Sequence, residues 1–129
     1  MVAPRKRIQL LLLLFAVFST HLIAQNDSVI KKLLNGVRDA SYYDSLKVFK
    51  AGAEVLKAGK NFNQHELLSE LNIYYGNHFF YTINYERAKH YYELALKEAE
   101  LAKSSHLSVL ARLRLTYIES ETEPLEQIE

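Results

Sequence analysis

Apolar residues recur at helical spacing along most of the chain, and no stretch of useful length shows the two-residue alternation of a strand. The pattern predicts helices over about residues 27–39, 42–58, 63–81, 84–102 and 105–119, with the start of a sixth at 123. The connections between them are short, so consecutive helices are expected to lie antiparallel. The sequence therefore predicts an all-α fold.

Capping residues and inward stripes define these helices further. The polar run 26–28 suits an N-cap, Asn63 and Glu66 resemble a capping box, and Gly59 stands where helices often end in a left-handed residue. In the second predicted helix the inward positions are Tyr42, Leu46, Phe49, Ala53 and Leu56. In the fifth they are Leu107, Leu110, Leu113, Leu115, Tyr117 and Ile118.

The first 24 residues have the organisation of a signal peptide. A basic start, 4–7, precedes an unbroken apolar run, 10–18, and the small residue Ala24 offers a cleavage point before Gln25. The alternative is an uncleaved anchor, although the apolar part spans only 17 residues against the ~20 that a membrane span needs. Either way the chain is expected to be exported, to the periplasm or cell envelope of a bacterium.

Charge and cysteine content narrow the range of partners. Residues 25–129 carry 13 basic and 15 acidic side chains, so nothing favours nucleic acid or an anionic surface. The chain has no cysteine, which rules out disulfides and a lipid-modified cysteine. Stability is therefore expected to come from packing alone.

Residues 25–129 also show internal similarity. The small-large-small series Ala88, Tyr92 and Ala95 repeats a pattern of the second helix found 42 or 43 residues earlier, and the fifth helix resembles the third after 38 residues. A repeated unit of two helices is typical of an α-solenoid. The chain holds about two and a half such repeats, which predicts one helical repeat domain over 25–129.

The middle repeat resembles the tetratricopeptide repeat (TPR). The family pattern W-x2-L-G-x2-Y…A-x3-F…P falls on Tyr75, Gly76, Phe79, Ala88 and Tyr92, with Ala95 three positions further on, and Gly76 and Ala88 are the residues that the family has there. The departures are Asn72 for Trp, Tyr75 for Leu, aromatic exchanges at Phe79 and Tyr92, and Glu100 in place of Pro. The resemblance implies that two backbones approach at Gly76 and Ala88 and that the rings of Phe79 and Tyr92 fill the remaining space.

The resemblance also implies a non-catalytic scaffold that binds a protein or peptide. In this family the first helix of each pair lines a concave groove, here formed by Glu70, Ile73, Asn77, Phe80, Tyr81, Ser108, Ala111 and Leu115. Asn77 is expected to hydrogen-bond an extended peptide backbone. No lysine or arginine accompanies it at the neighbouring groove positions, so capture of an acidic C-terminus is not indicated.

A second hypothesis comes from the order of segments. A signal peptide followed by such repeats resembles the sensory N-terminal part of bacterial envelope regulators, which implies an input fragment of a histidine kinase or transcription regulator. The membrane and output parts of such a protein are missing from these residues. Because Leu110, Leu113 and Tyr117 lack a packing partner, self-association through the fifth helix is also expected.

Enzymatic chemistry is the third hypothesis, and no motif favours it. His90 and Glu93 share a face but suit a surface contact better than a metal site, and Ser105-His106 lacks an orienting acid nearby. No phosphate-binding loop occurs, and the cluster of Lys103, Arg112 and Arg114 suits a solvated face. The dense aromatic residues suit packing between helices better than a stacking surface, Phe80 and Tyr81 excepted. No catalytic, cofactor or metal site is predicted.

Overall fold

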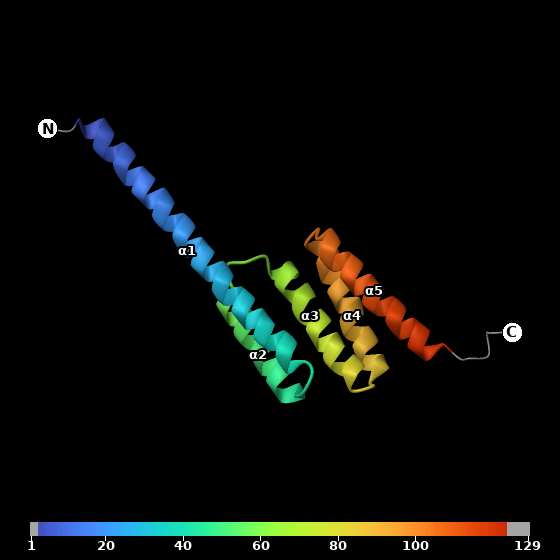
Figure 1. Cartoon of the computed structure of the whole chain (residues 1–129). Helices are drawn as coiled ribbons and strands as arrows, with labels where there is room; N and C mark the ends of the chain where they lie inside the picture. Colours follow the sequence, from blue (N-terminus) through green and yellow to red (C-terminus); the bar gives the residue numbers. More distant parts are fainter. Residues whose placement is uncertain (1–2, 124–129) are drawn as a thin grey trace. The chain divides into compact units, whose positions relative to one another are not determined.

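The computed structural model describes residues 3–123, and all its regular structure is helical. The helices are α1 (Pro4–Ala40), α2 (Ser45–Ala58), α3 (Gln64–Tyr81), α4 (Tyr85–Leu101) and α5 (Ser105–Thr122) (Figure 1). The predicted all-α class is confirmed for this part of the chain. Glu123 is the C-cap of α5, and the rest of the predicted sixth helix lies outside the described residues.

The chain divides into two compact units, Met1–Lys32 and Leu33–Glu129. The first unit contains most of α1, a helix that is long and apolar enough to cross a membrane, as a signal sequence or an anchor would be. Its most apolar 18-residue window has a mean hydropathy of 1.9, and none of that window is buried. The helix start predicted at 26–28 is wrong, because α1 begins at Pro4 and continues through these residues. Proline suits a first helical position, and no further proline or glycine follows before Gly36.

The second unit begins with the end of α1, and its next helix starts later than predicted. Asp44 caps α2, because its carboxylate accepts hydrogen bonds from the N–H groups of Leu46 (2.9 Å) and Lys47 (3.3 Å). Gly59 is the C-cap of α2, as the pattern indicated, but its φ of −93° is not left-handed. Left-handed residues occur instead after α3 and α4, at Ile83 (φ 60°) and Lys103 (φ 55°).

The inward face predicted for α2 is wrong at Tyr42, Leu46 and Ala53. Leu46 is 80% exposed and Tyr42 50% exposed, while Phe49 and Leu56 are only half-buried and Ala53 is exposed. The buried residues of α2 are Val48, Gly52 and Val55. A Cβ at Gly52 would overlap the hydroxyl of Tyr75, so α2 presents its glycine to α3. Leu46 and Tyr42 therefore lie away from the core, whereas the ring of Phe49 packs beside those of Tyr75 and Phe79.

The core of the second unit lies among α3, α4 and α5, which run antiparallel in sequence order (Figure 1). One cluster of buried residues joins α3, α4 and α5 through Ile73, Ala95, Ala99, Leu107 and Ala111. The hydroxyl of Ser69, fully buried, donates to the carbonyl of Ala95 (2.8 Å) and ties α3 to α4. Three alanines in one cluster let the helix backbones approach closely.

A second cluster confirms the contact predicted around Gly76. Phe79, Ala88 and Tyr92 pack together with Ile118, and each is at most 7% exposed. A Cβ at Gly76 would overlap the ring of Tyr92, so the glycine leaves the space that the ring fills. Small residues at 76 and 88 and rings at 79 and 92 thus form one interlocked contact between α3 and α4.

Candidate binding groove

The eight predicted groove residues come from α3 and α5, and the structure divides them between the core and the surface. Tyr81 is 43% exposed, and Glu70, Phe80, Ser108 and Leu115 are partly exposed. Ile73, Asn77 and Ala111 are at most 8% exposed. Placing these three on an open groove surface was wrong, because α5 packs over α3 and α4 and encloses them in the core.

Asn77 shows this burial most clearly. The hydroxyl of Tyr92 donates to the side-chain oxygen of Asn77 at 2.7 Å, inside the contact between α3 and α4. Burial raises the pKa of Tyr92, and the nearby guanidinium of Arg114 acts in the opposite direction. The hydroxyl therefore stays protonated at neutral pH and keeps donating. Asn77 satisfies a buried tyrosine here, which replaces its predicted role as a ligand for a peptide backbone.

A concave pocket of about 310 Å³ lies between the first halves of α3 and α5. Its lining residues are Glu66, Glu70, Ile73, Tyr74, Ser104, His106, Leu107 and Leu110. Ile73 and Leu107 belong to the buried core, whereas Glu66 and His106 are exposed. The pocket therefore has an apolar floor and a polar, mainly acidic mouth.

The acidic mouth is partly ordered by a hydrogen bond. The hydroxyl of Tyr74 donates to Oε1 of Glu70 at 2.9 Å, one turn along the same face of α3. Burial raises the pKa of Tyr74, and the charge of Glu70 and this hydrogen bond add to the effect. The Glu70 carboxylate is thereby held at the pocket wall with its second oxygen outside this bond.

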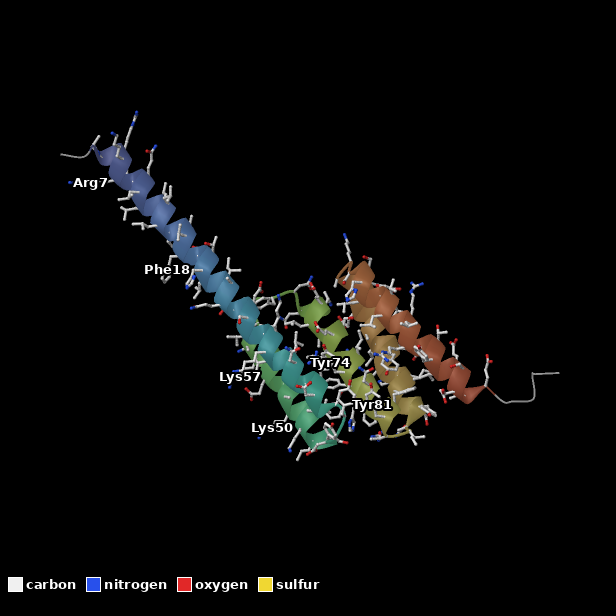
Figure 2. All side chains as sticks on the ribbon, viewed as in Figure 1. Arg7, Phe18, Lys50, Lys57, Tyr74 and Tyr81 are labelled. Carbon is white, nitrogen blue, oxygen red and sulfur yellow. The ribbon has the colours of Figure 1, made fainter. Side chains whose placement is uncertain are left out.

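The opposite end of α3 carries an aromatic and basic surface. Tyr81, about two turns beyond Tyr74 (Figure 2), stacks on Tyr42 with ring centroids 4.8 Å apart, and Tyr43 beside them is 90% exposed. Burial and a hydrogen bond with Tyr42 raise the pKa of Tyr81, and Arg114 opposes this. The positive charge of Arg114 thus acts on both Tyr81 and Tyr92.

Arg114 corrects the expectation that no basic residue accompanies the groove. It is half-buried, and its Nε has no hydrogen-bond partner among the described residues. The sequence pattern predicts a solvated position for Arg114, together with Lys103 and Arg112, and this prediction is wrong for Arg114. Arg112 does lie exposed and pairs with Glu100 of α4 at 3.2 Å. Residues 112 and 114 are about 200° apart around a helix, so only Arg114 turns toward α3.

Other pocket residues were missed or given a different role. The sequence predicts a capping role for Glu66, and the side chain of Asn63 does accept a hydrogen bond from the Glu66 N–H at 3.3 Å. Ser104 likewise caps α5 through the N–H of Leu107 at 3.4 Å. The spacing of Glu66 and Glu70, four apart on one helix face, was the available signal for an acidic surface.

The remaining histidines of the α3 region have structural partners. His78 is 3% exposed, and its Nδ1 donates to the carbonyl of Ser41 at 2.9 Å while Nε2 meets the hydroxyl of Ser45 at 2.6 Å. His65 pairs with Glu98 of α4 at 2.6 Å. Within residues 3–123, no group of three or more histidine and acidic side chains is arranged to hold a metal ion.

Comparison with known proteins finds no matching protein-family model, no matching curated protein and no matching solved structure. Function is therefore inferred from the pocket between α3 and α5 and from the aromatic and basic surface at the other end of α3.

Proposed function

We propose that this chain is a non-catalytic scaffold that binds a protein or peptide segment, built as a TPR-like solenoid of about two and a half repeats. The interlocked contact of Gly76, Phe79, Ala88 and Tyr92 supports the repeat interpretation, since it is the contact that the family pattern implies. The antiparallel order of α3, α4 and α5 agrees with it.

The observation that carries the binding proposal is the opposite charge at the two ends of α3. Glu66 and Glu70 stand at one end beside the apolar pocket, and Arg114 stands near Tyr81 at the other. The fifteen residue steps from Glu66 to Tyr81 span about 22 Å of helix, which equals six or seven residues of extended chain. Such a surface favours a short extended segment, because charge complementarity fixes its direction.

The pocket indicates what that segment carries. At about 310 Å³ it is at the small end of ligand pockets, and its floor is apolar. We expect one large apolar side chain to enter it, with a lysine or arginine beside it at Glu70. An acidic residue of the same segment then lies near Arg114.

The first prediction concerns the acidic mouth. Selection of random heptapeptides on the intact protein in detergent micelles should enrich a basic residue next to an apolar one. Glu70→Gln keeps the shape and the acceptor for Tyr74 but removes the charge, so the basic preference should fall by about tenfold, as for loss of one charge pair. Sequencing the selected peptides measures this preference.

Glu93→Gln is the matched control, because Glu93 is an exposed residue of α4 away from the pocket lining. Peptides selected on this variant should resemble those selected on the wild type. Equal enrichment of basic residues on Glu70→Gln, or no common pattern on the wild type, removes the groove as the binding site.

We propose further that residues 1–24 direct export and are removed after Ala24, so that the protein acts in the bacterial periplasm or envelope. The apolar helix of the first unit supports this proposal. Expressed with its N-terminal segment in a bacterium, the protein should appear in the periplasmic fraction with Gln25 as its first residue. Intact-mass measurement suits this test, because an N-terminal glutamine readily cyclises and blocks chemical sequencing.

Ala24→Leu is the control for processing, since it keeps the segment apolar but removes the small residue that cleavage needs. This variant should stay full-length and membrane-bound. Full-length wild-type protein in the membrane fraction would instead establish an anchor.

If the N-terminal segment is not cleaved and anchors the protein in the membrane, a second function is favoured, that of a sensory input segment of a signal-transduction protein. The observation in its favour is that α1 continues without a break from Pro4 to Ala40, so one helix contains both the apolar segment and residues 33–40 of the second unit. The sequence of the adjoining reading frame decides between the two functions.

A further inference from the structure

The side of α5 away from the core carries a line of exposed apolar residues. Val109 is 66%, Leu113 51% and Tyr117 54% exposed, at intervals of four residues along the helix. The buried residues Leu107, Ala111 and Ile118 lie on the opposite side. Figure 1 shows α5 as the outermost helix of the group formed with α3 and α4. An exposed apolar line of this length on a polar helix indicates an interaction surface.

Charge is distributed unevenly along the same helix. The C-terminal end carries Glu119, Glu121 and Glu123, with no basic residue in the last turn, and the first turn has no acidic residue. Lys103 and His106 stand at the N-terminal end. The helix dipole adds to this asymmetry, because it places partial negative charge at the C-terminal end. The negative charge at the C-terminal end of α5 is therefore not balanced by a basic residue in the last turn of the helix.

We infer that α5 binds α5 of a second copy of this chain in an antiparallel pair, with the two-fold axis at Leu113. The apolar line is symmetric about this residue, with Val109 four positions before it and Tyr117 four positions after it. In such a pair Leu113 packs on Leu113 of the partner subunit, and Val109 packs on Tyr117 of the partner subunit.

The charges favour the same orientation. An antiparallel pair places the three glutamates of each α5 beside the partner's N-terminal end, where a lysine, a histidine and the positive end of the dipole lie. A parallel pair would bring six glutamates together. This surface is separate from the proposed peptide groove, because none of Val109, Leu113 and Tyr117 lines the pocket.

Disulfide trapping tests the register, since the chain contains no cysteine of its own. Packed helices lie about 8–10 Å apart with Cα atoms about 2.3 Å from each axis, so two Cα atoms at the two-fold axis come about 3.5–5.5 Å apart. Leu113→Cys then satisfies disulfide geometry. Val109→Cys meets its own counterpart only across eight residues, about 12 Å along the axis, which is too far.

The intact protein is used in dilute detergent micelles with a mild oxidant, and dimers are followed by non-reducing electrophoresis. Leu113→Cys should dimerise at least tenfold faster than Glu93→Cys, an exposed control on α4. Val109→Cys and Tyr117→Cys should dimerise slowly alone but rapidly when mixed with different tags. If Leu113→Cys is as slow as the control, or Val109→Cys and Tyr117→Cys pair with themselves as fast, the antiparallel register is wrong.

A charge exchange provides the second measurement. In the Leu113→Cys background, Glu123→Lys should slow dimerisation severalfold, because residue 123 then faces Lys103 of the partner subunit. Adding Lys103→Glu should restore the rate. If neither substitution changes the dimerisation rate, the antiparallel orientation is wrong. Any dimers would then come from random contact through the apolar N-terminal segments.

Discussion

Ala88→Glu is expected to unfold the helical unit of residues 33–123. Ala88 has no exposed surface and lies against Phe79, Tyr92 and Ile118, so a longer side chain has no space and its carboxylate no partner. Burying an unpaired charge costs several kcal/mol, a large part of the 5–15 kcal/mol that stabilises a typical domain. Circular dichroism of the intact protein in mild detergent should lose most of its cooperative melting transition and retain a residual signal from α1.

Lys89→Glu is the matched control, because residue 89 is the exposed neighbour on the same turn of α4. It changes the net charge by two, against one for Ala88→Glu, yet it should shift the melting temperature only slightly, as surface substitutions do. A cooperative melt retained in Ala88→Glu at the wild-type temperature would show that residue 88 is not at the contact between α3 and α4.

The core around this residue could be predicted from sequence because its signal is local and redundant. Gly76 and Ala88 are small where a large residue would separate two helices, and Phe79 and Tyr92 are large where the space must be filled. The ends of the three helices that carry this contact were predicted within three residues: 63–81, 84–102 and 105–119 against Gln64–Tyr81, Tyr85–Leu101 and Ser105–Thr122.

The orientation of α2 could not be predicted in the same way. Its sequence offers two apolar faces, one with Leu46 and Phe49 and one with Val48 and Val55, and helical periodicity does not rank them. The choice is made by a tertiary contact, the insertion of the Tyr75 hydroxyl against Gly52. Residues 23 positions apart determine it, which lies beyond any local pattern.

The candidate groove was only partly predictable for a related reason. α3 has apolar or aromatic residues on nearly all sides because it packs against α2, α4 and α5. The sequence therefore could not show whether Ile73 faces the core or a groove, and the same ambiguity applies to Ala111. Arg114 was missed because its neighbourhood depends on how α5 lies across α3. Glu70 was placed correctly at an accessible position of α3.

The glycines provide the second large prediction, because the same substitution should have opposite effects at two sites. Gly36→Ala should raise the free energy of unfolding by about 0.5–1 kcal/mol, since glycine in a helix costs about that much relative to alanine. Gly36 lies within α1 in the second unit, and a Cβ there meets no atom within 4 Å. Gly76→Ala gains the same helix propensity but should lower the free energy of unfolding by about 1–3 kcal/mol through overpacking.

Whether Gly76→Ala raises or lowers the free energy of unfolding depends on whether Tyr92 can move away from the added methyl group. The overlapping atoms belong to the body of the ring, Tyr92 is 1% exposed, and its hydroxyl is fixed by Asn77. At Gly52 the overlap involves chiefly the tip of Tyr75, which is half-buried and has more freedom. Gly52→Ala should therefore fall between the other two variants.

Urea titrations of the three variants, followed by circular dichroism in the same mild detergent, measure this order directly. We expect the free energy of unfolding to be highest for Gly36→Ala, intermediate for Gly52→Ala and lowest for Gly76→Ala. All three substitutions gain the same helix propensity, so this order follows from the mobility of the atoms that each Cβ meets. If Gly76→Ala is as stable as Gly36→Ala, the ring of Tyr92 does not fill the space beside residue 76. The close contact of α3 and α4, and the repeat interpretation that depends on it, would then have to be abandoned.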